Sequence, residues 1–200
     1  MTKARYHHGD LANALVDEAL RAVEEGGAEA LSMRDLAARL GVSRAAPYRH
    51  FEDRDALLAV VAARGFEALG VDYEAALTGP GDGRARLEAA SRAFFAFAYR
   101  RPGLYRLMFE SDLLGRDPTP EVLMGPANAS FHQIWRAIQG AYPDANESEV
   151  KMRAILLMST GHGFLALDQA GRFKRFMYEP MTHEEMVEAV MRTAMQYGPI

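Results

Sequence analysis

Residues 31–51 read LSMRDLAARLGVSRAAPYRHF, and this stretch decides the fold. Ser32 is a suitable N-cap for a short helix, with the carboxylate of Asp35 three residues further on. Gly41 then supplies the left-handed residue that ends such a helix. Between these signals the apolar residues recur at the spacing of one helix face, at Met33, Leu36, Ala37 and Leu40.

The second part of the stretch predicts another short helix, capped by Ser43 and anchored at Phe51. Pro47 would be its fourth residue, where a proline removes about one intrahelical hydrogen bond, so we expect the helix to form. Ala45 and Ala46 would let its backbone approach a groove wall closely. Two short helices joined by a glycine turn are a helix-turn-helix. The second lacks acidic residues up to His50 and resembles a recognition helix in composition, with accessible Arg44, Tyr48, Arg49 and His50.

The composition is that of a soluble globular chain. It has 200 residues, 49% of them hydrophobic and 25% charged, and no cysteine, which excludes disulfides, thiolate metal sites and cysteine nucleophiles. The net charge is −4, and acidic residues outnumber basic ones even in residues 1–55, so DNA binding must depend on where a few cations lie. The N-terminus lacks a secretory signal and the run 154–167 is too short to span a membrane, so we expect a cytoplasmic protein without membrane partners.

Helical patterns continue through the whole chain, so the predicted fold class is all-α. Three helices precede Phe51, and Asp53 is placed to cap a fourth that runs to about Leu77. The Gly/Pro-rich break at 78–83 is the clearest linker signal. We therefore predict a helix-turn-helix domain at 1–55, a linking helix at 56–78 and a helical domain at 79–200.

The second half predicts a helical bundle. Helices are expected from Arg84 to about Tyr99, from Pro102, and from about Ala127 after an irregular, proline-rich connection. A long helix should follow the Asn146 and Glu149 pair to about residue 170, and a last one should follow the capping box of Thr182 and Glu185.

These features resemble the TetR family of transcriptional regulators. The likeness is carried by the helix order, the run LSMRDLAARLGVSRAAPYRHFEDRDALL (31–58) and the all-helical second half, and it covers residues 6 to about 70 well. The segments YHHGDL (6–11) and GHGFLALDQAGRF (161–173) resemble a subgroup with a WHG-like C-terminal motif, with Gly161 in the place of its tryptophan. The resemblance implies a homodimer on a palindromic operator in double-stranded DNA. It also implies a small-molecule pocket in the second half and dimerisation through the last two long helices.

By position, the resemblance also implies which residues lie at the DNA. Arg54 occupies a position where the family usually has a phosphate-binding lysine, and arginine keeps that charge. Arg44 is the better candidate for bidentate reading of a guanine, whereas Tyr48 is expected to donate to a phosphate. The candidate DNA contacts are Ser32, Arg34, Ser43, Arg44, Ala45, Pro47, Tyr48, Arg49, His50 and Arg54.

An aromatic and methionine set in the second half is the candidate effector site, because rigid rings and adaptable methionines suit apolar ligands. An ordinary core explains the same spacing equally well. The two glycines around His162 cost a helix about 2 kcal/mol relative to alanine, so either close packing near a dimer interface or space for a ligand should compensate. The candidate ligand-binding residues are Phe94, Tyr105, Met108, Phe109, Phe131, Trp135, Met158 and His162.

Neither a metal nor a cofactor is expected. His7 and His8 are adjacent on a basic N-terminal arm without converging ligands, and His183 lacks a second histidine at i+4. Nucleophile–base pairs and phosphate loops are also missing, so an enzyme or carrier is poorly supported. The leading hypothesis is a repressor released from DNA by a small apolar ligand. The alternative is a constitutive DNA-binding protein with a filled core.

Overall fold

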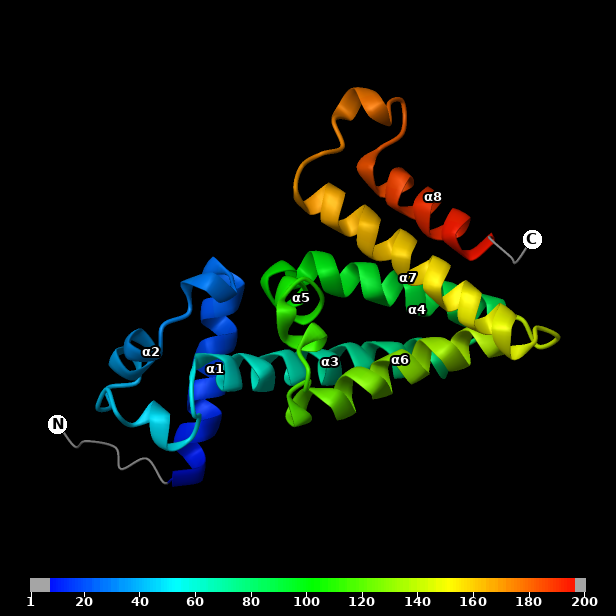
Figure 1. Cartoon of the computed structure of the whole chain (residues 1–200). Coiled ribbons are helices and arrows are strands. Elements are labelled where there is room, and N and C mark those ends of the chain that lie inside the picture. The colour runs from blue at the N-terminus through cyan, green and yellow to red at the C-terminus, as the bar shows by residue number, and fades with distance from the viewer. Residues whose placement is uncertain (1–7, 197–200) are drawn as a thin grey trace. The chain divides into compact units, whose positions relative to one another are not determined.

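The computed structural model describes residues 8–196, and every regular element in that range is helical. The predicted all-α fold is therefore confirmed (Figure 1). No helix in residues 8–196 is long and apolar enough to cross a membrane. In chain order the elements are α1 (His8–Gly26), η1 (Ala28–Ala30), α2 (Met33–Arg39), η2 (Pro47–Arg49), α3 (Arg54–Leu77), α4 (Gly83–Arg100), α5 (Pro102–Phe109), η3 (Asp112–Gly115), α6 (Glu121–Ala141), α7 (Glu147–Gln169), η4 (Arg175–Met177) and α8 (His183–Gln196).

Several helix starts follow the predicted capping chemistry. The backbone N–H of Ala56 donates to the Asp53 carboxylate over 2.7 Å at the start of α3. At α7, Asn146 and Glu149 form a reciprocal capping box with bonds of 3.1 and 2.8 Å. Thr182 and Glu185 do the same at α8, at 2.7 and 3.2 Å. Each box satisfies two backbone N–H groups that a helix start leaves unpaired.

The predictions for two elements are wrong, one in the type of helix and one in the residue at which the helix begins. The segment after Ser43 is not an α-helix: it is a turn followed by the 3₁₀ helix η2. Pro47 has no N–H to donate to the Ser43 carbonyl, which accepts instead from Ala46 N over 2.9 Å. The helix expected from about Ala127 begins earlier, at Glu121, and contains Pro126. Leu123, in its first turn, is fully buried and stabilises this start of the helix.

Contacts divide the chain into two compact units, described here separately. The first is Met1–Glu67 with Arg101–Ala127, and its core includes Leu15, Leu36, Leu57, Leu104 and Met108. Its α1 and α5 approach so closely that a Cβ at Gly103 would lie 2.3 Å from the Val23 carbonyl oxygen. Only glycine permits that approach.

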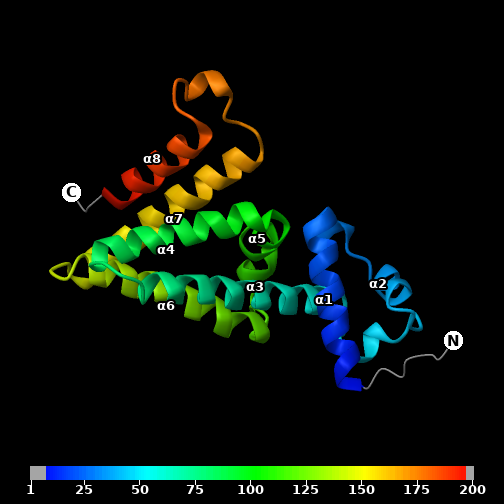
Figure 2. The ribbon, with the colours of Figure 1, turned by 180° about the vertical axis from the view of Figure 1, so that it is seen from behind.

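The second unit is Ala68–Arg100 with Asn128–Ile200. In both views α8 lies beside α7 (Figures 1 and 2). Its buried residues include Leu69, Phe97, Ile138, Leu165 and Met191. This division by packing does not test the functional division into 1–55, 56–78 and 79–200, which stays a prediction. The basic arm predicted around His7, including the His8 side chain, lies outside the described residues.

Candidate nucleic-acid interface

The first arm of the helix-turn-helix, Ser32 with α2, is fixed by its cap and its buried face. Ser32 is extended at φ −128° and ψ 122°, and its hydroxyl accepts from the Asp35 N–H over 3.4 Å, as predicted. Met33, Leu36 and Ala37 are buried. The first arm therefore turns its apolar face inward and leaves Arg34 exposed, 3.4 Å from the Asp35 carboxylate.

Gly41 ends the first arm with the expected positive φ, at 65°. Its N–H donates to the Ala38 carbonyl over 3.1 Å, and the Val42 N–H donates to the Ala37 carbonyl over 2.9 Å. This pair of bonds is the Schellman pattern, which closes the last carbonyls of a helix and reverses the chain. The turn delivers the chain directly into the next segment.

The second arm, Ser43–Phe51, exposes most of its side chains. Tyr48 is 56% exposed, and only Pro47 of the 3₁₀ turn is buried. Ser43, Arg44, Ala45 and Arg49 are also exposed, whereas His50 is half-buried. The structure thus places the predicted contact residues of this arm on one short exposed segment.

The two arginines of the second arm, Arg44 and Arg49, differ in their charged surroundings from Arg34 and Arg39 of the first arm, which pair with carboxylates. Arg39, on α2, lies 3.0 Å from Glu18 and 3.5 Å from Glu25, and these contacts hold its pKa above its usual value. Among the side chains of residues 11–195, which are the ones that the structure describes, Arg44 and Arg49 have no ion-pair partner. Their charge is therefore available to phosphates or base edges.

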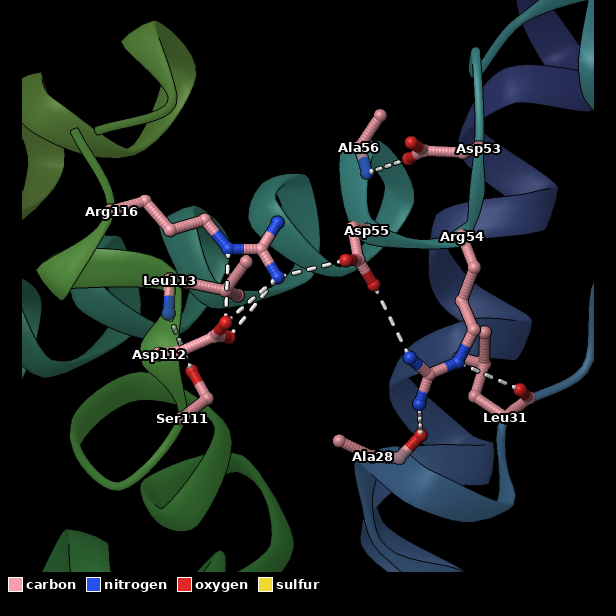
Figure 3. A network of polar contacts seen from close by, with 10 residues as sticks. All are labelled: Ala28, Leu31, Asp53, Arg54, Asp55, Ala56, Ser111, Asp112, Leu113 and Arg116. Carbon is pink, nitrogen blue, oxygen red and sulfur yellow. Dashed lines mark hydrogen bonds and ion pairs between the residues drawn. The ribbon is translucent and has the colours of Figure 1, made fainter. Parts of the chain in front are cut away.

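Arg54 is situated differently from the other DNA-contact candidates. Its half-buried guanidinium has partners within the first unit, where Nε donates to the Leu31 carbonyl over 3.0 Å and Nη1 lies 3.2 Å from the Asp55 carboxylate (Figure 3). A further N–H donates to the Ala28 carbonyl. Sequence reasoning missed these partners, since nothing local shows that residues 23 and 26 positions earlier lie within reach.

The predicted ligand-binding residues fall in both units. Tyr105 and Met108 are 1% exposed in the first unit, where Phe109 packs edge-on to Phe66 with ring centroids 5.1 Å apart. The other five lie in the second unit: Phe94, Phe131, Trp135, Met158 and His162.

Within the second unit two pairs of the candidates meet. The rings of Phe94 and His162 are 5.0 Å apart, and those of Phe131 and Trp135 are 6.0 Å apart. Burial lowers the pKa of His162 to about 4, so the imidazole is neutral at physiological pH. A Cβ at Gly161 would meet the Phe94 ring at 3.5 Å, an ordinary contact, so close packing there does not strictly require glycine.

Sequence reasoning also missed a cleft of about 340 Å³ between α4 and α8. Phe95 and Val187 line it, and Arg92 spans it with two bonds to Glu188 of 2.9 and 3.1 Å. No sequence signal connects these residues, because nearly a hundred positions separate the two walls.

The carboxylate of Asp168 contacts two polar side chains that line this cleft, Tyr99 and His183. It accepts from the Tyr99 hydroxyl over 2.6 Å, and the His183 Nε2 lies 2.9 Å from the same carboxylate. Burial, followed by the bond to Asp168, raises the pKa of Tyr99. The lining of the cleft thus combines apolar side chains with polar groups that already have hydrogen-bond partners.

Comparisons with known proteins identify both halves. Residues 15–61 match the family described as bacterial regulatory proteins, tetR family, and residues 87–194 match the tetracyclin repressor-like C-terminal domain. The second match alone spans more than half of the chain. The chain belongs to the TetR family. The resemblance predicted from the sequence is confirmed for the family, while the WHG-like subgroup stays a prediction.

Individual relatives are similar to this chain over different lengths. The chain is 38% identical over 86 residues to the HTH-type transcriptional activator FasR of Mycolicibacterium smegmatis, covering 43% of this chain and only 39% of FasR. It is 29% identical over 144 residues to the nucleoid occlusion factor SlmA of Marinobacter nauticus, covering 71% of each chain. A Rhodococcus protein of unknown function has a TM-score of 0.79 at 30% identity, covering 97% of this chain and 98% of that one.

This TetR-family chain is a DNA-binding transcriptional regulator of the helix-turn-helix class. Its motif runs from Ser32 to Phe51, and its second arm is a 3₁₀ turn in this structure.

Proposed function

We propose that this TetR-family regulator is a homodimeric repressor that binds a palindromic operator and is released by a small apolar ligand. The observation that carries the DNA-reading part is the pair Arg44 and Arg49 on the exposed second arm, which have no ion-pair partner among the side chains of residues 11–195. Arg44 reads a guanine, and Tyr48 and Arg49 contact phosphates, which set orientation rather than sequence. Because its target is operator DNA, such a regulator acts in the cytoplasm.

An apolar stripe on α7 supports the dimer. Met152, Ile155, Met158 and Leu167 are 46, 57, 38 and 48% exposed, which is unusual for four large apolar residues on one helix of a lone chain. Pairing α7 and α8 with the same helices of a second copy would cover them. The two second arms would then enter successive major grooves, about 34 to 36 Å apart.

A ligand in the second unit would change DNA affinity only if it binds one spacing of the two arms more tightly than the other. The α4–α8 cleft and the Phe94–His162 contact are the supporting observations, because both offer apolar surface. FasR is named as an activator, so the direction of regulation in this chain needs its own measurement.

Anisotropy titration against the DNA upstream of the protein's own gene tests the DNA-binding proposal. A specific site should bind at least a thousandfold more tightly than a scrambled duplex of the same composition, and log K should fall linearly with log salt. Equal affinity for both duplexes, with no salt dependence, would contradict it.

A constitutive regulator with a filled core remains the second candidate, because Tyr105 and Met108 are fully buried. The fluorescence of Trp135, the single tryptophan, separates the two candidates. An effector-responsive protein should change its emission with at least one compound of an apolar library and lose operator affinity with the same compound. A filled core should give neither change.

A further inference from the structure

A network of ion pairs closes the base of the helix-turn-helix. Arg54 is the first residue of α3 and stands just beyond the exit of the motif, while Leu31 stands just before its entrance. Arg54 Nε donates to the Leu31 carbonyl over 3.0 Å, so the two ends of the motif are joined through one side chain (Figure 3). Its second bond, to the Ala28 carbonyl, reaches the connection between α1 and α2.

Asp55 links this contact to a distant segment. One carboxylate oxygen lies 3.2 Å from Arg54 Nη1, and the other accepts from Arg116 Nη2 over 2.8 Å (Figure 3). Arg116 also donates from Nε to Asp112 over 3.2 Å. Two guanidinium groups and two carboxylates therefore balance in charge, and Arg54 is already paired with a carboxylate inside the unit.

The segment that carries Arg116 is itself held in place. Ser111 caps η3, with its hydroxyl accepting from the Leu113 N–H over 3.4 Å. Thr119 donates to the Arg116 carbonyl over 3.0 Å. Arg116 thus projects from an anchored turn, and the Arg54–Asp55–Arg116 network connects that turn to the base of the motif.

We infer that Arg116 positions the DNA-reading second arm through Asp55 and Arg54, and that Arg54 serves this network instead of binding a DNA phosphate. The inference rests on the proposed function for its DNA readout. It revises the phosphate contact expected for Arg54, because each of the three guanidinium nitrogens already donates one N–H to a partner inside the unit. A positioning residue changes how well the arms fit DNA without removing a phosphate contact.

The test compares operator affinity over a salt series for the full-length wild type, Arg116→Gln and Arg54→Gln. Both variants should weaken binding about three- to tenfold while the slope of log K against log salt stays at the wild-type value. Arg136→Gln is the matched control, because Arg136 forms an exposed pair with Glu74 in the other unit, and it should leave affinity unchanged. Arg116→Lys should recover part of the loss, since lysine reaches one carboxylate but not two.

A double-mutant cycle tests the connection. If Arg116 acts through Asp55, adding Arg116→Gln to Asp55→Asn should weaken binding no further than Asp55→Asn alone. Full additivity would overturn the inference. So would a salt slope that falls by about 0.9 in Arg54→Gln, because that is the loss of one phosphate contact.

Amide hydrogen exchange without DNA gives an independent readout. Arg116→Gln should speed exchange in residues 27–35 about tenfold while α7 and α8 keep their protection. Unchanged exchange there, or a loss spread over the whole chain, would overturn the positioning role. If the wild type shows no sequence preference for DNA, the proposed function fails, but the exchange experiment still decides whether the network holds the base of the motif.

Discussion

The two arms of the helix-turn-helix are held by different forces. The first arm has a side-chain cap, a Schellman end and a buried apolar face. The second arm has one buried residue in its 3₁₀ turn, Pro47, and exposes Arg44, Tyr48 and Arg49. The arm that we propose reads DNA therefore depends on its attachments rather than on its own packing.

The largest effect on stability is expected in the first arm. Leu36 is 2% exposed, and Leu36→Ala should lower the free energy of unfolding by about 2 to 5 kcal/mol through lost burial and a residual cavity. Tyr48→Ala in the second arm should change it by less than about 0.5 kcal/mol, because the ring is mostly in solvent. Urea unfolding followed by circular dichroism measures both. Equal losses would mean that the second arm also stabilises the fold.

The next effect concerns binding and belongs to the second arm. Arg44→Gln should lose about 1 to 3 kcal/mol of discrimination between the operator and a variant with the contacted guanine replaced. Its unfolding midpoint should match the wild type. Competition anisotropy with both duplexes measures the discrimination, with Arg136→Gln as the control. If Arg44→Gln still discriminates between the two duplexes as the wild type does, another residue must read the guanine.

A smaller effect on stability is expected at Ser32, the cap of the first arm, than at Leu36, and a still smaller one at Ser43 in the second arm. Ser32→Ala should cost about 1 kcal/mol, because the Asp35 N–H loses its capping acceptor. Ser43→Ala should cost less than about 0.5 kcal/mol, since the Ser43 side chain has no hydrogen bond to any of residues 11–195. Thermal unfolding of the two variants provides the comparison. A larger loss at Ser43 would indicate that it caps a helix after all.

The last prediction concerns Pro47, where the local backbone conformation should change with little net effect on stability. Pro47→Leu restores the N–H needed for a bond to the Ser43 carbonyl, while the unfolded chain regains freedom, so the net change should stay below about 1 kcal/mol. Backbone Cα chemical shifts of residues 44–50 should move toward α-helical values. Unchanged shifts would mean that the 3₁₀ form has a cause other than the proline.

Local chemistry in the sequence predicts the first arm well and the second arm poorly. The Ser32 cap, the Gly41 turn and the capping boxes of α7 and α8 depend on residues three or four positions apart, so the sequence shows them. The second arm was predicted as an α-helix because one lost hydrogen bond at Pro47 is a small cost. Few residues of the arm are buried, however, so little burial free energy is available to offset even that small cost.

The tertiary contacts of the candidate sites were out of reach for the same reason. Neither the internal partners of Arg54 nor the pairing of Arg92 with Glu188 leaves a local pattern, because each joins segments far apart in the chain. The identities of the DNA-contacting residues, by contrast, come from the sequence and stay predictions. Spacing alone gave no means of separating ligand-lining aromatic residues from core.

Hydrogen-exchange mass spectrometry of the full-length protein with and without its operator tests the central claim most directly, namely that the second arm reads DNA while the first arm holds the motif. DNA should slow exchange in peptides covering Ser43–Phe51 and at the Ser32 end of α2. The already protected centre of α2 and the helices α4, α7 and α8 should change little. Protection confined to α7 and α8, or absent from residues 43–51, would contradict the account.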